Sequence, residues 1–144
     1  MTDTLVIEGH ASLFGLADLG GDVVARGAFA ASLATRRTIP MLFQHDPSEP
    51  IGVWTSITED ARGLHVRGEI LTTGPRGRAA STLVRRGAVD GLSIGFRTRA
   101  SRPREARGRV LTALDLWEVS IVTFPMLPQA RLRLVALQPS RVAA

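Results

Sequence analysis

Glycine and proline interrupt this sequence so often that long regular elements do not fit between them. The 144 residues include 14 glycines and 8 prolines, and the short stretches between these breaks are rich in Val, Ile, Leu, Thr and Trp. Runs of β-branched and aromatic residues bounded by turn formers are typical of strands. The sequence therefore predicts a mainly β fold with a few helices, which places it in the α+β class.

The same pattern predicts where the elements lie. Two helices are expected, at 28–35 and at 78–86, and the second stops before Gly87, a residue type common just after a helix. A chain of 15.5 kDa fits one domain over residues 1–144, with 139–144 as a frayed tail. The predicted strands are 5–14, 39–44, 52–58, 64–71, 92–98 and 110–124.

Composition excludes several classes of protein. Hydrophobic residues make up 44% and charged residues 22%, which is ordinary for a globular domain and argues against disorder. No run approaches the ~18 apolar residues of a membrane span, and the amino terminus lacks the basic start of a secretory signal. We expect a soluble, cytoplasmic protein with no membrane partner.

The absence of cysteine excludes a disulfide framework, a thiolate zinc site and a cysteine protease. Neither a metal-binding motif nor a phosphate-cradling glycine loop is present, so we expect no metal and no cofactor.

The charge of the chain favours an acidic partner. All 18 cationic residues are arginine, and the formal net charge is +5. The segment 97–109 is the densest part, with six arginines against one acid, Glu105. Because Pro103 and Gly108 interrupt it, it is predicted to be an exposed, mobile loop between two strands. A contact with phosphate or an acidic peptide is the alternative interpretation.

The first candidate for chemistry is His45, in the segment from Gln44 to Pro47. A histidine at the end of a strand, followed by a turn-forming Asp-Pro pair, is held rigidly yet faces an opening. A structural role is the alternative. We interpret Asp46 as a turn residue. The other histidines, His10 and His65, are predicted to be structural, with His65 on a solvated face of the sheet.

The second candidate is Ser93, the serine of a G-x-S-x-G pattern over 91–95. An α/β-hydrolase is excluded because no histidine follows the serine and the chain is too short. What remains is a serine between two glycines, where a substrate backbone could approach closely. Alternation places Ser93 opposite the apolar face of Leu92, Ile94 and Phe96. The hydroxyl is therefore predicted to leave the core.

The third candidate is Glu118, which lies in an apolar stripe. A period of two aligns it with Leu114, Leu116, Ser120 and Val122 on one side of a strand. An unpaired, ionised carboxylate costs several kcal/mol to bury, so Glu118 needs a partner. Both a salt bridge to an arginine and a contact with an imidazole satisfy this requirement.

The order of these candidates, His then Ser then Glu, resembles that of the prohead proteases of tailed phages, the family typified by the phage HK97 enzyme. The resemblance covers most of the chain and rests on several spaced motifs. These are Gly21-Asp22-Val23-Val24, Gly27-Ala28-Phe29, Ser32-Leu33, Met41-Leu42-Phe43-Gln44-His45-Asp46, Pro50-Ile51-Gly52, Gly63-Leu64, Gly91-Leu92-Ser93-Ile94-Gly95-Phe96, and Glu118-Val119-Ser120-Ile121-Val122 ending at Pro125.

The resemblance implies a closed, mostly antiparallel β-barrel like that of the herpesvirus assemblins. It also implies a serine endopeptidase with Ser93 as nucleophile, His45 as general base and Glu118 as the third member. The implied substrate is the scaffold protein or the amino-terminal scaffolding segment of the major capsid protein. The implied place is the interior of assembling procapsids in the bacterial cytoplasm, for a tailed phage, a prophage or a gene transfer agent. As a further partner we expect a second copy of the chain, bound weakly.

The rival interpretation is a non-catalytic basic β-barrel that binds capsid protein or nucleic acid. An aromatic content of 5%, with no tyrosine, offers few platforms on which single-stranded bases could stack. The presence of His45, Ser93 and Glu118 together disfavours an inactive relative. A small scaffolding protein would need a long amphipathic helical pattern, which the sequence lacks. The charge of 97–109 predicts that this segment helps to recruit acidic scaffold or portal surfaces.

Overall fold

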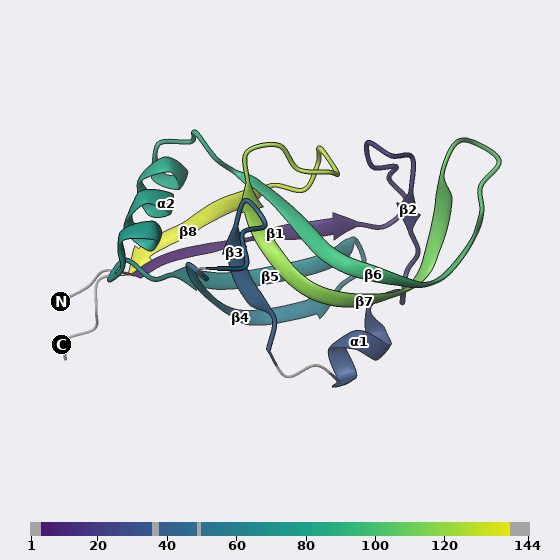
Figure 1. Ribbon diagram of the computed structural model, residues 1–144, viewed down its shortest axis with the longest axis horizontal. Coiled ribbons are helices and arrows are strands. Elements are labelled where there is room, and N and C mark those ends of the chain that lie inside the picture. Colours follow the sequence, from purple (N-terminus) through teal and green to yellow (C-terminus); the bar gives the residue numbers. More distant parts are fainter. Residues whose placement is uncertain (1–3, 36–37, 49, 139–144) are drawn as a thin grey trace.

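The computed structural model describes residues 4–35, 38–48 and 50–138, so the predicted tail at 139–144 lies outside the described residues. Within these ranges the chain forms eight strands and two helices (Figure 1). In chain order they are β1 (Thr4–Leu13), β2 (Val23–Val24), α1 (Ala30–Thr35), β3 (Pro40–Phe43), β4 (Gly52–Glu59), β5 (Gly63–Ile70), α2 (Pro75–Arg85), β6 (Gly91–Pro103), β7 (Arg109–Val122) and β8 (Leu132–Gln138). All six predicted strands and both predicted helices are present, and β2 and β8 are additional.

The strands form one sheet in the order β2-β7-β3-β4-β5-β1-β8, with β6 also paired to β7. The length of β7 allows this branching. Its first residues pair with β2 and its last residues with β3, both in parallel, while β6 runs antiparallel beside it. Three segments that are distant in the chain therefore meet along the second half of β7.

The expected closure into a barrel is wrong, because the sheet is open. The sheet is mostly antiparallel as expected, and its two parallel pairs are those of β7 with β2 and with β3. Among the described residues, β6 meets the residue that precedes β8 in an isolated bridge between Gly91 and Arg131, and no ladder joins the two strands. Beyond that bridge β8 stays paired with β1, whereas β6 follows β7 into a long hairpin (Figure 1). The two edges diverge, and the sheet cannot close.

Alternation along the strands builds the core. In β5, Leu64, Val66 and Ile70 are buried, while His65 and the charged residues between them are partly exposed. Burying one large apolar side chain contributes about 1.5–3 kcal/mol, so these inward faces hold the sheet in its curved form. The largest fully buried side chains are Phe29, Leu5, Ile7, Met41, Ile51, Leu64, Ile70, Leu92, Leu111, Leu116, Ile121 and Val66.

Helix α2 begins at Pro75, three residues before its predicted start, because proline fits the first helical turn. It ends as predicted: Gly87 follows the cap residue Arg86 with φ of +76°, the left-handed conformation that glycine adopts readily. Neither α1 nor α2 is long and apolar enough to cross a membrane.

The arginine-rich segment 97–109 is a β-hairpin and not the predicted mobile loop, since β6 extends to Pro103 and β7 starts at Arg109. Three of its arginines tie the hairpin to the connection before β2. Arg104 donates to the carbonyl oxygens of Gly21 and Arg107, Arg107 donates to that of Leu19, and Arg109 pairs with Asp22 at 2.9 Å. The remaining three, Arg97, Arg99 and Arg102, are exposed on β6.

Candidate active site

His45 lies in a tight turn directly after β3. Gln44 and His45 have φ of 56° and 60°, which is the left-handed region, and Asp46 N donates to Phe43 O at 3.1 Å to close the turn. Two consecutive positive φ angles are the mark of a type I′ turn. Residues other than glycine pay about 1–3 kcal/mol each for such a conformation, so the surrounding structure must hold it.

The side chain of Gln44 supplies part of that support. Its Nε2 donates to Thr123 Oγ1 at 2.6 Å, and its Oε1 accepts a hydrogen bond from Thr123 N at 3.1 Å. Its backbone N–H also donates to Ile121 O at 2.9 Å. These three bonds fasten the turn to the end of β7.

Glu118 on β7 contacts the imidazole of His45. Its Oε2 lies 2.5 Å from His45 Nδ1, while its Oε1 accepts a hydrogen bond from Ser120 Oγ at 2.7 Å. The Ser120 hydroxyl in turn accepts from His45 N at 3.1 Å. Of the two partners that the sequence left open for Glu118, the structure contains the imidazole.

Ser93 lies on the neighbouring strand β6, directly opposite Ser120, and Gly95 is directly opposite Glu118. Directly opposite residues of an antiparallel pair share a face, with Cβ atoms about 4.5–5.5 Å apart. Ser93 therefore shares a face with Ser120 and Glu118. The predicted exposure of its hydroxyl is wrong, because Ser93 is 6% exposed.

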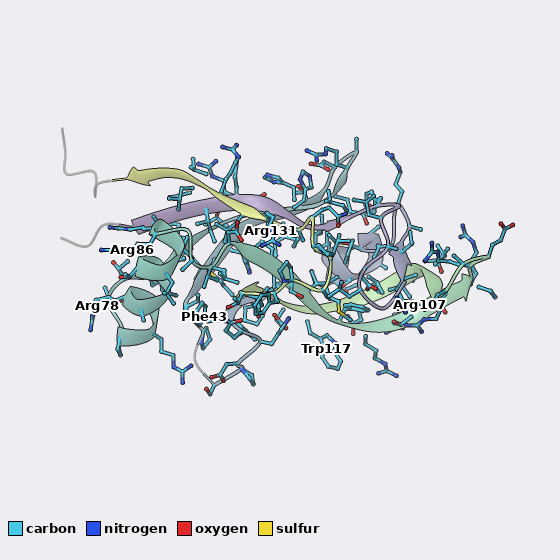
Figure 2. All side chains as sticks on the ribbon, turned by 90° about the horizontal axis from the view of Figure 1, so that it is seen from above. Phe43, Arg78, Arg86, Arg107, Trp117 and Arg131 are labelled. Carbon is cyan, nitrogen blue, oxygen red and sulfur yellow. The ribbon has the colours of Figure 1, made fainter. Side chains whose placement is uncertain are left out.

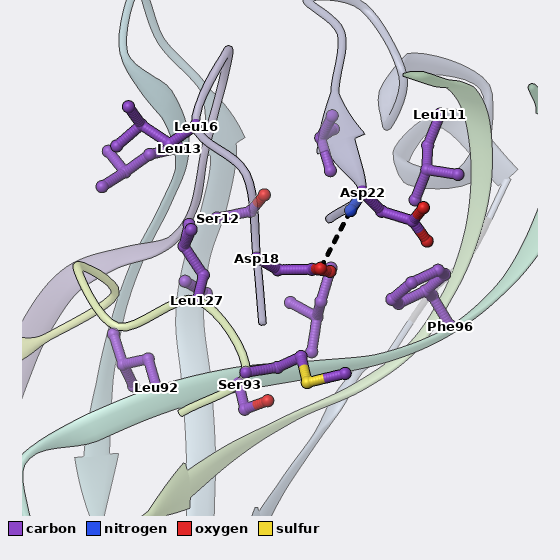
Figure 3. A pocket seen from close by; sticks show the side chains of 14 residues that line it. Ser12, Leu13, Leu16, Asp18, Asp22, Leu92, Ser93, Phe96, Leu111 and Leu127 are labelled. Carbon is purple, nitrogen blue, oxygen red and sulfur yellow. Dashed lines mark hydrogen bonds between the residues drawn. The ribbon is translucent and has the colours of Figure 1, made fainter. Parts of the chain in front are cut away.

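Residues of β6 also line a cavity. Its walls include Leu92, Ser93 and Phe96 of β6 together with Leu127, and Figure 3 shows the side chains that line it. Within the described residues, Ser93 Oγ has no hydrogen-bond partner, so its proton is not committed to another group.

Gly95 explains how the carboxylate of Glu118 fits beside β6. A side chain at this position would overlap Oε2 of Glu118, which is the oxygen that contacts His45. The second glycine of the G-x-S-x-G pattern therefore makes room for the carboxylate. It is required for close approach and not for an unusual backbone conformation.

The environment raises the pKa of His45. The hydrogen bond that His45 Nδ1 donates to Glu118 is the largest cause, the partial burial of the ring acts in the opposite direction, and the negative charge of Glu118 adds to the increase. The His45 side chain is 43% exposed and that of Glu118 is 14% exposed. With Nδ1 facing the carboxylate, Nε2 is the nitrogen that can exchange a proton with a neighbouring hydroxyl.

The other two histidines lie elsewhere, on β1 and β5. His10 Nε2 is 2.7 Å from Asp60 Oδ2, and its ring meets that of His65 edge to face with centroids 5.3 Å apart. His65 in turn lies 3.9 Å from Glu8. In the part of the chain that the structure describes, no group of three or more His, Asp or Glu side chains is arranged to hold a metal ion.

Sequence reasoning missed Ser120, Gln44 and Thr123. A signal for Ser120 was present, since it lies two residues after Glu118 on the same predicted face. The role of Gln44 had no such signal, because it depends on a left-handed turn and on the meeting of two distant segments.

Comparisons with known proteins agree with the resemblance expected from the motifs. The model of the caudovirus prohead serine protease family matches residues 1–143. The prohead protease of Enterobacteria phage HK97 is 38% identical over 130 residues, which cover 87% of this chain. The chain spans 57% of the length of that relative.

Solved structures show the same fold at low sequence identity. The KSHV protease in complex with a hexapeptide phosphonate inhibitor superposes with a TM-score of 0.64 at 13% identity, over 92% of this chain and 65% of that protein. The capsid assembly protease gp21 of bacteriophage T4 gives 0.65 at 13% identity, over 83% and 82% of the two chains. The expected herpesvirus protease-like fold is thus confirmed apart from its closure. With the family match over nearly its full length, the chain belongs to the caudovirus prohead serine protease family.

Proposed function

We propose that this chain is a serine endopeptidase of procapsid maturation, with Ser93 as nucleophile, His45 as general base and Glu118 as the carboxylate that orients the base. The observation that carries the proposal is the contact of 2.5 Å between His45 Nδ1 and Glu118 Oε2, beside the cross-strand pair of Ser93 and Ser120. Family membership supports the same reaction class.

The proposed reaction starts when Ser93 Oγ attacks the carbonyl carbon of the scissile peptide bond. His45 Nε2 takes the hydroxyl proton as the bond forms, and Glu118 stabilises the resulting imidazolium and keeps Nδ1 protonated. The imidazolium then gives its proton to the leaving amine, which leaves an acyl group on Ser93. Water, deprotonated by His45, releases the acyl group as a carboxylate.

Ser120 contacts His45 and Ser93 is the cross-strand partner of Ser120, and the environments of the two serines distinguish them. Ser120 is 0% exposed, and its hydroxyl proton is donated to Glu118, so it neither reaches a substrate nor has a proton to give to His45. Ser93 has an uncommitted hydroxyl. Catalytic hydrogen bonds are often long before substrate binds and tighten in the complex, so the proposed Ser93 to His45 bond forms with the substrate.

The proposed substrate is the scaffold protein or the amino-terminal scaffolding segment of the major capsid protein, cut inside procapsids in the bacterial cytoplasm. The names of two similar proteins, prohead protease and capsid assembly protease, support this assignment. Weak self-association of the chain belongs to the same proposal. The exposed arginines of the β6–β7 hairpin are proposed to recruit acidic scaffold or portal surfaces.

Coexpression with the major capsid protein of the same genome tests the proposal. We expect the native chain to shorten the capsid protein, as measured by intact mass, and Ser93→Ala to leave it whole. Ser81→Ala is a matched control, because Ser81 is a buried serine of α2 whose hydroxyl has no partner among the described residues. Equal shortening by the native chain and by Ser93→Ala would remove Ser93 as nucleophile.

The same experiment separates the rival function. A capsid protein that stays whole with the native chain, while the chain still copurifies with procapsids, would indicate the non-catalytic binding protein. Loss of cleavage in Ser81→Ala as well as in Ser93→Ala would indicate that any change to a buried serine disturbs the fold.

A further inference from the structure

We propose that Ser120 is a positioning residue, which aligns His45 and Glu118 with each other through one hydroxyl group. This inference rests on the proposed function, in which His45 moves the proton. Ser120 contacts both partners: its Oγ donates to Glu118 Oε1 at 2.7 Å and accepts from His45 N at 3.1 Å. A hydroxyl has one proton to donate, so the direction of both bonds is determined.

The bond to Glu118 determines how the carboxylate faces the histidine. Ser120 holds Oε1 and His45 Nδ1 holds Oε2, so the two oxygens have separate partners and rotation of the carboxylate breaks both bonds. Hydrogen bonds to charged groups are worth about 1.5–3 kcal/mol, roughly twice those between neutral groups. Without the Ser120 hydroxyl, the imidazole would be the one remaining hydrogen-bond partner of the carboxylate among the described residues.

The bond to His45 acts on its backbone. The N–H group of His45 belongs to a left-handed turn with φ of 60°, and the Ser120 hydroxyl accepts a hydrogen bond from it. Removing the acceptor leaves this N–H unpaired, which favours a different backbone conformation of the turn. The same hydroxyl therefore restrains the ring through Glu118 and the main chain through the amide.

The location of Ser120 suits this role. It is 0% exposed, and its Cα partners are Leu42 on β3 and Ser93 on β6. Ser120 thus lies between β3, which leads to His45, and β6, which carries Ser93, on the same strand as Glu118. Because it is buried and its proton is committed, it acts through its neighbours and not on the substrate.

Among the described residues, Glu118 is the charged group that acts on the pKa of His45. Glu118 faces the ring from β7, and Asp46 belongs to the same turn, but the carboxylate of Asp46 is bonded to Ser48 at 2.6 Å and to Arg76 at 2.8 Å. Protonation of His45 therefore reports mainly on how well Glu118 is held.

The variant Ser120→Ala tests the proposal against the control Ser32→Ala. Ser32 is also a buried serine, and its Oγ accepts a hydrogen bond from Leu116 N of the same strand β7 at 2.9 Å, away from His45. Each variant leaves one backbone N–H of the protein without its acceptor. We expect Ser120→Ala to lower kcat about 10–100-fold with KM changed less than about twofold, and to move the acid limb of the pH profile to lower pH. We expect Ser32→Ala to lower thermal stability while kcat and the acid limb stay as in the native chain.

A second measurement is independent of activity. In the Ser93→Ala background, NMR titration of the His45 ring gives its pKa directly. Adding Ser120→Ala should move this pKa towards the ordinary histidine value of 6.5, and adding Ser32→Ala should not move it. If the native chain cleaves nothing, the proposed function fails, and this titration still decides whether Ser120 holds the pair together.

The result that overturns the proposal is a Ser120→Ala protein with native kcat, native acid limb and native His45 titration. Equal loss of kcat in Ser32→Ala would overturn it as well, since the effect would then be general destabilisation. If Ser120→Ala does not fold, Ser120→Cys replaces it, because a thiol is a weak donor and weak acceptor of similar size. It should give a smaller loss of kcat with a shift of the acid limb in the same direction, and native values of both would refute the role.

Discussion

Glu118 Oε2 lies 2.5 Å from His45 Nδ1, and this contact joins residues 73 positions apart in the chain. The parallel pairing of β3 with β7 brings them together, because Phe43 at the end of β3 lies opposite Ile121. The left-handed turn then returns the imidazole over Ser120 and Glu118. The geometry of the pair thus depends on the sheet, on the turn and on the free space at Gly95, and each of these can be tested.

The pH dependence of cleavage tests the contact in the native chain. Glu118 raises the pKa of His45 above its ordinary value of 6.5, and a general base must be deprotonated to act. Protonation should therefore stop cleavage at a higher pH than it would with an isolated histidine as base. We expect the acid limb of kcat/KM to have its midpoint above pH 6.5. A flat profile through this range would contradict base catalysis by an imidazole.

Glu118→Gln should reduce kcat by roughly 10⁴-fold, because a neutral amide neither fixes the tautomer of His45 nor stabilises the imidazolium. The side chain keeps its size, so KM and the thermal unfolding temperature should change little. Steady-state kinetics on a capsid-derived peptide provide the measurement. A variant within tenfold of the native rate, roughly 1.4 kcal/mol, would mean that Glu118 is not the partner that matters.

Gly95→Ala should abolish most of the activity while leaving the nucleophile and base in the sequence. The added methyl group overlaps Oε2 of Glu118, so the carboxylate must move away from His45. Gly74→Ala is the matched control, since a Cβ at Gly74 meets nothing within 4 Å. We expect cleavage to survive in the control and to be lost in Gly95→Ala. Native cleavage by Gly95→Ala would show that the free space beside β6 is not needed for activity.

The hydrogen bonds between the Gln44 side chain and Thr123 predict that two substitutions of Gln44 differ in stability. Gln44→Ala loses both side-chain hydrogen bonds to Thr123 and should destabilise the protein by about 1–3 kcal/mol. Gln44→Gly loses the same bonds but adopts a positive φ at little steric cost, so it should be more stable than the alanine variant. Both should cleave more slowly than the native chain. Denaturant unfolding and peptide cleavage measure the two effects. A native cleavage rate in Gln44→Ala would show that the hydrogen bonds to Thr123 are not needed for activity.

The hairpin predicts a separation of recruitment from catalysis. Replacing Arg97, Arg99 and Arg102 together by Gln should lower incorporation into procapsids, most clearly at low salt, with cleavage of a short peptide unchanged. The control removes three exposed arginines of the α2 region, Arg78, Arg85 and Arg86. Figure 2 shows that Arg78 and Arg86 lie at the opposite end of the molecule from Arg107. Equal incorporation of the two triple variants would dismiss recruitment by the hairpin.

The sequence predicted the elements better than their arrangement, for physical reasons. Alternation in segments such as 64–71 is local and visible, so β5 was predicted to within one residue at each end. Strand β8 was missed because its stability comes from pairing with β1 at the far end of the chain. Closure of the sheet depends on where β6 and β8 diverge, and the spacing of apolar residues does not encode that.

The candidate site was predictable in its residue types and not in its contacts. An isolated carboxylate in an apolar stripe requires a partner, which is why Glu118 stood out, but an arginine would have satisfied the same requirement. In the sequence, Ser120 is not distinguished from the other small residues of a strand. Its hydrogen bond from His45 N depends on a turn whose positive φ angles are not predicted by any local residue preference.

The register of β6 against β7 is regular from Gly91 to Gly95 and becomes irregular immediately afterwards, with the first bulge between Gly95 and Phe96. All later irregularities lie farther out, towards the tip of the hairpin. Insertions or deletions in that arm are therefore absorbed before they reach Ser93 and Glu118. A change in the length of the arm would therefore leave the cross-strand pairs of Ser93 with Ser120 and of Gly95 with Glu118 in place.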